Sequence, residues 1–335
     1  MRSIKVEGLD IPWTALTLGG MQIAPSKEWG DVCTEEDADR VVKTALECGI
    51  MAFDTAEAYG KGESERRLGK ALDSRKNDVL IISKITPDAE MTPEGFMKRL
   101  ERTLKNLRRD YVDAYLVHWP GYYVDSFQNM QKLCDVMIAL KESGKTRTIG
   151  ISNFKSKDII LMSELAPMFT INQVPYNLLH RVYEGENLRE CEKAGIGYMA
   201  CSPSARGLLA GRFNEEALKA PTRRDYPLYN QPYFDNSEIV RDTVQEISEE
   251  INTAPINVAL AWVIQQRNIT TAVVGAHKVD QVREFCAAGE ITLTSDQLNR
   301  LNKESNLFHG WKSTGIGCSE SAALILAGVN KPTSR

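Results

Sequence analysis

Short apolar runs alternate with longer segments whose apolar residues recur at helical spacing through most of the chain. The runs are rich in β-branched residues and have the length of strands, whereas the longer segments show the period of amphipathic helices. Eight strand–helix units most simply close into a (β/α)8 TIM barrel, with a doubly wound open sheet as the alternative. The eight predicted strands cover residues 15–18, 51–54, 79–84, 111–118, 146–151, 169–174, 197–202 and 271–275.

Several predicted helices have readable starts. Thr34 and Thr92 each stand directly before a helical segment, where a threonine caps the first turn, and the second is followed by a proline that suits the first helical position. Ser295 begins another helix near the end of the chain. Residues 195–200 have the GxGxxA form of a dinucleotide fingerprint, but they precede a strand instead of joining a strand to a helix. We therefore do not interpret them as a binding loop.

Three segments do not follow the repeat. Residues 4–11 resemble a small hairpin that could plug the bottom of the barrel. Residues 206–236, after the seventh strand, contain proline and glycine breaks and little periodicity, and we expect this long loop to fold over a ligand. Residues 305–335 are predicted to form a partly mobile C-terminal tail. The whole chain, 1–335, is predicted to be a single barrel domain with a core of about residues 12–304.

Composition narrows the class of protein. Hydrophobic residues make up 42% of the 335 positions and charged residues 26%, and no apolar run is long enough to span a membrane, so we expect a soluble protein. The 41 basic and 45 acidic residues nearly balance, which argues against nucleic acid as a partner. The seven cysteines form no CxxC pair and the start of the chain has no secretory signal, so we expect reduced thiols and a cytoplasmic location.

Four chemically distinct side chains follow apolar runs: Asp54, Tyr59, Lys84 and His118. Active sites of such barrels lie at the C-terminal ends of the strands, so we expect these groups to meet at one rim. An ammonium beside a tyrosine favours the phenolate and makes the phenolic proton easier to give, and a carboxylate can pair with that ammonium. A histidine can donate a hydrogen bond to a substrate oxygen. Each residue alone is usually structural, but together they suit protonation of a carbonyl oxygen as hydride reaches the carbon.

The motifs around these residues resemble those of the aldo-keto reductases. The stretches 53–60 (FDTAEAYG) and 116–120 (LVHWP) match the segments that carry the family's Asp-Tyr-Lys-His tetrad. Residues 150–154 (GISNF) and 172–177 (NQVPYN) are similar to its nicotinamide-binding segments, and the resemblance spans roughly residues 12 to 304.

The resemblance implies a nicotinamide cofactor. Ser202–Arg212 is similar to the family's pyrophosphate loop, and residues 275–284 are similar to its adenosine-phosphate site, where Lys278 would meet a 2′-phosphate and favour NADPH over NADH. The cofactor-binding residues so implied are Gly20, Met21, Asp54, Ser152, Asn153, Gln173, Cys201, Ser202, Ser204, Arg206, Arg212, Gly275, His277, Lys278 and Gln281. Two positions depart from the family pattern: Cys201 replaces an aromatic residue that stacks on the nicotinamide, and Phe285 replaces an asparagine that bonds the adenine.

The sequence thus predicts an NADPH-dependent reductase of an aldehyde or ketone, with a small-molecule carbonyl substrate as its partner and the oligomeric state left open. A cofactor-bearing binding module, similar to potassium-channel β-subunits, is the alternative. The histidines show no ligand spacing with the cysteines, so no metal site is expected. The predicted substrate pocket is lined by Trp29, Trp119, Tyr122 and Tyr123.

Overall fold

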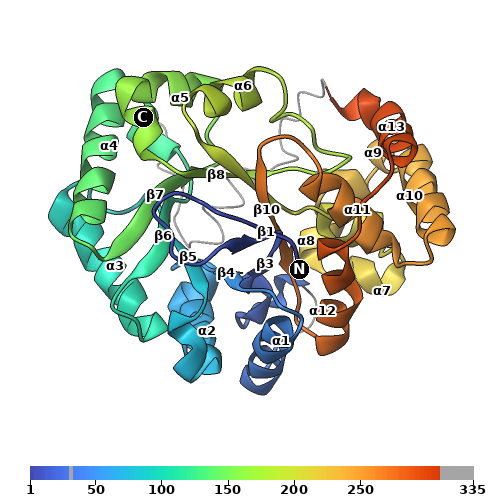
Figure 1. The fold of residues 1–335 in the computed structure, drawn as a ribbon, viewed down its shortest axis with the longest axis horizontal. Helices are drawn as coiled ribbons and strands as arrows, with labels where there is room; N and C mark the ends of the chain where they lie inside the picture. The colour runs from blue at the N-terminus through green and yellow to red at the C-terminus, as the bar shows by residue number, and fades with distance from the viewer. Residues whose placement is uncertain (30–32, 310–335) are drawn as a thin grey trace.

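Eight parallel strands close into a barrel in a computed structural model that describes residues 1–29 and 33–309, apart from the side chains of Lys27 and Tyr122. The strand order around the barrel is β10-β3-β4-β5-β6-β7-β8-β9 (Figure 1). The predicted (β/α)8 barrel is therefore confirmed. The strands are β3 (Leu16–Gly19), β4 (Ala52–Asp54), β5 (Leu80–Ile85), β6 (Val112–Val117), β7 (Thr146–Ser152), β8 (Ile171–Pro175), β9 (Gly197–Cys201) and β10 (Ile269–Gly275).

Helices surround the barrel, and their starts follow the capping residues. The side-chain oxygen of Thr34 accepts a hydrogen bond from the Asp37 N–H, and that of Thr92 accepts one from the Gly95 N–H. Thr294 caps the last helix in the same way. The helices are α1 (Glu35–Glu47), α2 (Glu63–Leu72), α3 (Pro93–Leu107), α4 (Phe127–Glu142), α5 (Ser156–Met162), α6 (Glu186–Lys193), α10 (Glu238–Glu250), α11 (Pro255–Ile264), α12 (Val279–Phe285) and α13 (Ser295–Glu304).

The strands divide their side chains between the barrel interior and the layer under the helices. On β5, Leu80 and Ile82 lie in a cluster inside the barrel, whereas Ile81 and Ile85 belong to the core between barrel and helices. Because successive residues of a strand point to opposite faces, the inward position after Ile82 is Lys84. The same alternation turns Asp54 of β4 inward. The period of the strands therefore brings polar side chains to the inside of the barrel at its carboxyl end.

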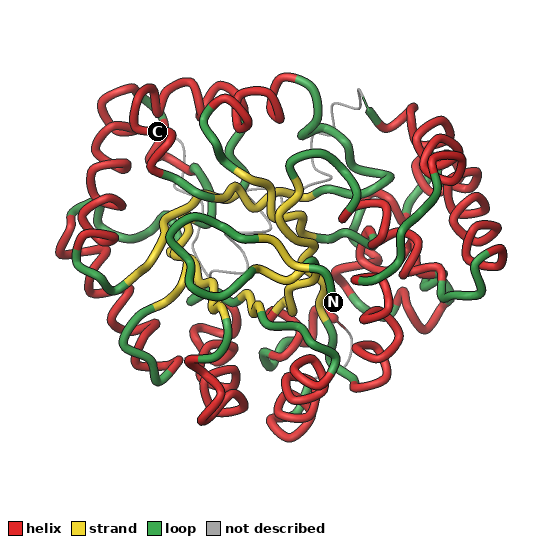
Figure 2. The backbone as a smooth tube through the Cα atoms, viewed as in Figure 1, coloured by secondary structure: helices red, strands yellow, loops and turns green. Residues whose placement is uncertain are grey.

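The amino end of the barrel is closed by the N-terminal segment, as the sequence predicts. β1 (Ser3–Ile4) pairs antiparallel with β2 (Trp13–Thr14), and the arm between them crosses the centre of the barrel in Figures 1 and 2. Trp13 is fully buried in the interior cluster, and Val6, Leu9 and Ile11 pack against it. The Trp13 indole donates a hydrogen bond of 3.0 Å to the Thr17 hydroxyl, so its one polar atom is satisfied.

The long segment after β9 is more regular than the sequence predicts. It forms a chain of short helical turns because local backbone hydrogen bonds recur although apolar periodicity does not. The turns are η7 (Ala205–Ala210), α7 (Glu215–Leu218), α8 (Pro221–Arg224), η8 (Pro227–Tyr229) and α9 (Tyr233–Asn236). Short 3-10 turns also lie at η3 (Tyr59–Gly62) and η10 (Ser305–Phe308). The rest of the predicted tail, 310–335, lies outside the described residues. None of the helices within residues 1–29 and 33–309 is long and apolar enough to cross a membrane.

Candidate active site

A cavity opens at the carboxyl end of the barrel, where the inward-facing strand positions are polar or small. These positions are Gly19, Asp54, His118, Ser152, Gln173, Cys201 and Gly275, one from the end of nearly every strand. Loops, short turns and the helices α11 and α12 add further wall residues, which include Met21, Gln22, Trp29, Tyr59, Trp119, Asn153, Ser202, Ser204, Arg206, Arg212, Arg223, Ile256, Gln281, Glu284 and Phe285. Most of the predicted site residues therefore meet around one cavity.

A buried ion pair of Lys84 with Asp54 lies directly under this cavity. The Lys84 ammonium lies 2.6 and 2.7 Å from the two carboxylate oxygens of Asp54 and donates to the Thr55 carbonyl at 2.8 Å. The Gln173 amide donates to the same carboxylate at 3.0 Å. Burial raises the pKa of the Asp54 carboxyl, while the bonds from Lys84 and Gln173 oppose that rise. The pair holds a cation at a fixed place under the cavity.

Tyr59 lies next to the Lys84 ammonium, but it reaches that position from a turn and not from a strand end. We expect a tyrosine at the end of a strand, but Tyr59 begins the 3-10 turn η3, after the end of β4 at Asp54. The turn returns its side chain to the rim, where the hydroxyl lies 3.4 Å from the Lys84 ammonium. The ring of His118 meets the tyrosine ring edge-on with centroids 5.7 Å apart. The structure thus brings all four residues of the predicted tetrad together.

The setting of His118 favours the neutral imidazole. Burial, and secondarily the charge of Lys84, lowers its pKa well below the ordinary value. Its ring stacks on Trp119 with centroids 3.7 Å apart, and within the described residues its Nδ1 atom has no hydrogen-bond partner. A neutral imidazole at the cavity wall can donate one hydrogen bond to an oxygen placed there.

Two loops of the rim adopt backbone conformations that most residues avoid. After β9, φ is 51° at Ser202, 51° at Ala205 and 60° at Arg206, and after β7 it is 66° at Asn153. Such left-handed residues cost energy and persist where the surrounding structure demands them, commonly at ligand sites. Successive N–H groups in alternating right- and left-handed conformations form concave anion sites. The loop around Ser204 and Arg206 has the backbone suited to a phosphate.

The comparisons with known proteins agree with this geometry. The model of the "Aldo/keto reductase family" matches residues 15–305. The chain belongs to this family. As an aldo-keto reductase it is an NAD(P)H-dependent oxidoreductase that acts on small-molecule carbonyl compounds, and the prediction of an enzyme is confirmed.

Similar proteins cover nearly the whole chain. Aldo-keto reductase YhdN of Bacillus subtilis is 29% identical over 286 residues, which are 82% of this chain and 85% of YhdN. The NADH-specific methylglyoxal reductase of Escherichia coli is 26% identical, covering 88% and 95%. The structure of the glycerol dehydrogenase AKR11B4 from Gluconobacter oxydans superposes with a TM-score of 0.78 and 25% identity, covering 93% and 97%.

The residues expected to meet the adenosine phosphate are divided between two hollows of this reductase. Gln281 lines the main cavity, whereas His277 and Lys278 line a neighbouring hollow with Cys33 and Arg40. The backbone N–H groups of His277 and Lys278 donate to the Gln281 side chain at 2.9 and 3.1 Å, which joins the two hollows. Gly20 lies outside the cavity wall. A Cβ atom there would come within 2.7 Å of the Ser64 hydroxyl, so this glycine serves close packing under the rim.

The predicted substrate pocket is only partly assembled. Trp29 and Trp119 line the cavity. Tyr123 does not, because its ring packs against Phe96 in the core and its hydroxyl donates to the Ala89 carbonyl at 2.7 Å. The Tyr122 side chain lies outside the described part of the chain. An aromatic residue after a strand can face the core or the cavity, and its position in sequence does not decide which.

Arg223 lines the cavity but escapes sequence reasoning. It is buried, donates from Nε to the Arg206 carbonyl at 2.9 Å, and its guanidinium lies 5.8 Å from the Trp29 ring centroid. It stands in a segment without periodicity, so only its place beside another arginine hints at a role. Gln22 is a second cavity residue that the sequence does not predict. Its side-chain oxygen is buried without a hydrogen-bond partner in the described ranges. Both side chains add hydrogen-bonding groups to the cavity wall, which suits a dinucleotide ligand.

Proposed function

We propose that this enzyme reduces an aldehyde or ketone to the alcohol and that Tyr59 gives the proton. The observation that carries the proposal is the 3.4 Å separation of the Tyr59 hydroxyl and the Lys84 ammonium at the cavity wall. An ammonium at this distance stabilises the phenolate that remains when the proton leaves. Asp54 holds the Lys84 ammonium in place through hydrogen bonds of 2.6 and 2.7 Å. Tyr59 is then the general acid of the site.

His118 orients the substrate in this proposal. Because burial lowers the pKa of His118, we assign it the neutral form, whose single N–H donates to the carbonyl oxygen and leaves the proton transfer to Tyr59. A nicotinamide held beside Ser152, Asn153 and Gln173 would supply hydride to the carbonyl carbon. Trp29 and Trp119 exclude water from the reacting end of the cavity.

We further propose NADPH as the preferred cofactor. Ser152, Asn153 and Gln173 offer donors and acceptors to the carboxamide, and their side chains meet at the wall beside Asp54. The left-handed loop around Arg206 suits the pyrophosphate. The hollow that holds Lys278 supplies a cation for a 2′-phosphate. The methylglyoxal reductase relative is NADH-specific by name, so NADH is the competing cofactor that an experiment has to separate.

The Tyr59→Phe variant tests the function. We expect carbonyl reduction to fall by about 10²–10⁴ because the general acid is lost, while NADPH binding persists because the hydroxyl acts on the substrate. NADPH oxidation should be followed with a panel of aromatic aldehydes, methylglyoxal and ketones, and NADPH binding by fluorescence titration. Near wild-type turnover of the variant would remove Tyr59 from the role of proton donor. A wild-type protein that binds NADPH but reduces no member of the panel would contradict the proposed activity.

A further inference from the structure

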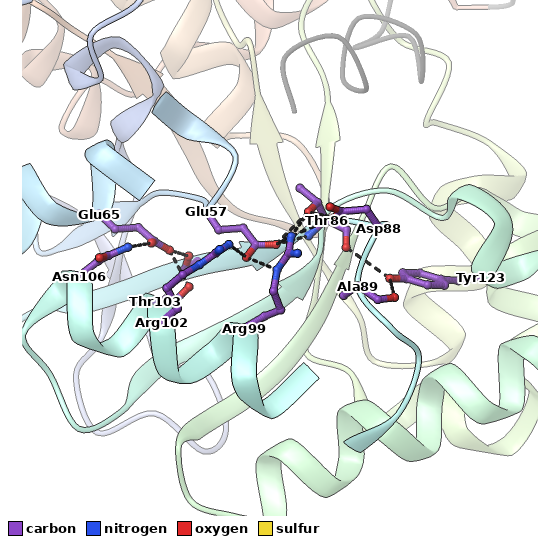
Figure 3. Close-up of polar contacts among 11 residues, drawn as sticks. Glu57, Glu65, Thr86, Asp88, Ala89, Arg99, Arg102, Thr103, Asn106 and Tyr123 are labelled. Atoms are coloured by element: carbon purple, nitrogen blue, oxygen red, sulfur yellow. Dashed lines mark hydrogen bonds and ion pairs between the residues drawn. The ribbon is translucent and has the colours of Figure 1, made fainter. Parts of the chain in front are cut away.

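Glu57 is a buried carboxylate between Asp54 and Tyr59 that the proposed reaction does not use. It faces away from the cavity toward helix α3, where the Arg99 guanidinium clasps it with two bonds of 2.7 Å, one to each carboxylate oxygen (Figure 3). Arg102 adds a bond of 2.9 Å. The carboxylate is almost fully buried, so a substantial desolvation cost is offset by these two cations.

The Glu57 carboxylate also replaces part of the backbone ladder between β4 and β5. The Thr55 N–H donates to the Ile82 carbonyl at 2.8 Å, but the next bond, from the Glu57 N–H to the Lys84 carbonyl, lengthens to 3.4 Å as the strands part. The Glu57 side chain then accepts from the Thr86 N–H at 2.8 Å and from the Thr86 hydroxyl at 2.9 Å. The loop that carries Tyr59 is thereby held to the strand that carries Lys84.

The same network reaches the loop that follows His118. The carbonyl groups of Thr86 and Ala89 accept hydrogen bonds from the Tyr123 hydroxyl at 3.4 and 2.7 Å, and Arg99 also bonds Asp88 at 2.9 Å (Figure 3). Three loops, which leave β4, β5 and β6, therefore share one set of polar contacts on the outer side of the rim. These loops follow the three strands whose ends and loops carry the tetrad.

We propose that Glu57, clasped by Arg99, is a positioning residue that sets the distance between the Tyr59 hydroxyl and the Lys84 ammonium. This positioning role rests on the proposed function, in which the distance between the Tyr59 hydroxyl and the Lys84 ammonium governs proton transfer. Glu57 touches neither substrate nor cofactor in this role. It acts by fixing the turn from Asp54 to Tyr59 against the end of β5, and a displacement of about 1 Å in such a site can cost about 10²-fold in rate.

The barrel contains a matched control at the other end of β5. Asp113 is also a buried carboxylate, and it accepts from the Ile81 N–H at 2.7 Å and from Arg109 at 2.9 Å. It thus makes the same kinds of contact as Glu57, with an arginine and with a backbone N–H near one end of β5, but at the amino end of the barrel. Loss of its charge tests the cost of disturbing such a pair without touching the rim.

The test compares Glu57→Gln and Asp113→Asn with the wild-type chain. Each amide keeps the shape but turns donors toward an arginine, so both variants should unfold at lower temperature. We expect only Glu57→Gln to lower kcat, by about 10- to 100-fold, with the Kd of NADPH within about twofold of wild type. Its pH profile should also change: with Tyr59 farther from Lys84, the alkaline limb of kcat moves to higher pH. Arg99→Lys, which keeps the charge but loses the two-pronged contact, should give a smaller loss in the same direction.

A second readout separates this inference from the proposed reaction. Ionisation of Tyr59 can be followed by ultraviolet absorbance as the difference between each protein and its Tyr59→Phe counterpart, without any turnover. The midpoint should rise in Glu57→Gln and stay at the wild-type value in Asp113→Asn. If Glu57→Gln lowers the unfolding temperature but leaves kcat, the pH profile and this midpoint unchanged, Glu57 is only a packing residue. If the wild-type protein reduces no carbonyl compound while the midpoint still shifts, the reaction is wrong and the positioning role stands.

Discussion

The two ends of the barrel are built from the same strands and differ in what their inward side chains do. On β5, Leu80 and Ile82 face the interior and lie against the plug residue Trp13, whereas Lys84 faces the interior at the open end. The amino end is closed by a hairpin, and the buried ion pair of Arg109 with Asp113 lies there beside a strand start. The carboxyl end places the buried ion pair of Lys84 with Asp54 under a cavity. The inward positions of the same strands therefore stabilise the fold at the amino end and supply polar groups for chemistry at the carboxyl end.

The largest effect should come from removing the cation of each ion pair. Lys84→Met and Arg109→Met each leave a buried carboxylate without its partner, at a cost of about 3–5 kcal/mol in the free energy of unfolding. The loss should be smaller at Arg109, because burial raises the pKa of Asp113 and the charge of Arg147 also opposes that rise. Urea unfolding measures both, and turnover per folded molecule should vanish only in Lys84→Met. Equal loss of turnover in both variants would show that the two ends are not functionally separate.

The plug provides the second test. Trp13→Ala removes the largest side chain of the interior cluster and should cost about 3–5 kcal/mol in unfolding free energy, since the cavity cannot refill easily. Below the unfolding transition, kcat and KM should match wild type, because Trp13 lies at the amino end. A changed KM for the aldehyde would mean that packing at the closed end shapes the open end.

The sequence predicts the barrel better than it predicts the loops. Most residues of the eight strands are buried and many are apolar, so the sequence predicts the strand ends within about two residues, and strand alternation accounts for the inward positions of Asp54 and Lys84. The position of Tyr59 depends on a 3-10 turn that has no apolar period, and the orientation of Tyr123 depends on which loop it meets. Arg223 is not predicted either, because it also stands in a segment without an apolar period.

Long-range contacts mark the limit of sequence reasoning at the rim. Glu57 and its partner Arg99 are 42 positions apart, and they meet only because α3 packs behind the ends of β4 and β5. The motif that contains Glu57 indicates the tetrad but says nothing of what lies behind it. Cofactor contacts depend on backbone conformation as well, since the left-handed residues Ser202 and Ala205 are not glycines and carry no signal of a turn.

The proposed contact of Lys278 with the cofactor, far from the tetrad, should give a smaller effect when it is removed. Lys278→Ala should weaken NADPH binding by about 1.5–3 kcal/mol and leave NADH nearly unchanged, because only NADPH carries the 2′-phosphate that this cation would meet. Lys43→Ala is the control: Lys43 pairs with Asp39 on α1 and lies outside the hollow that holds Lys278. Fluorescence titration of both cofactors gives the two affinities. An equal loss for NADPH and NADH would place Lys278 away from the 2′-phosphate.

The smallest effect concerns Cys201, at the end of β9 on the cavity wall. Neighbouring Tyr176 does not take the place of an aromatic residue there, because its ring stacks on Trp262 with centroids 5.5 Å apart and its hydroxyl bonds Glu184. Cys201→Tyr should therefore give the nicotinamide a face to stack on, tighten NADPH binding by about 0.5–1.5 kcal/mol and slow its release. Cys201→Leu adds bulk without an aromatic face and should gain less. Weaker NADPH binding in the tyrosine variant, measured by titration and stopped flow, would mean that the wall has no room for a ring.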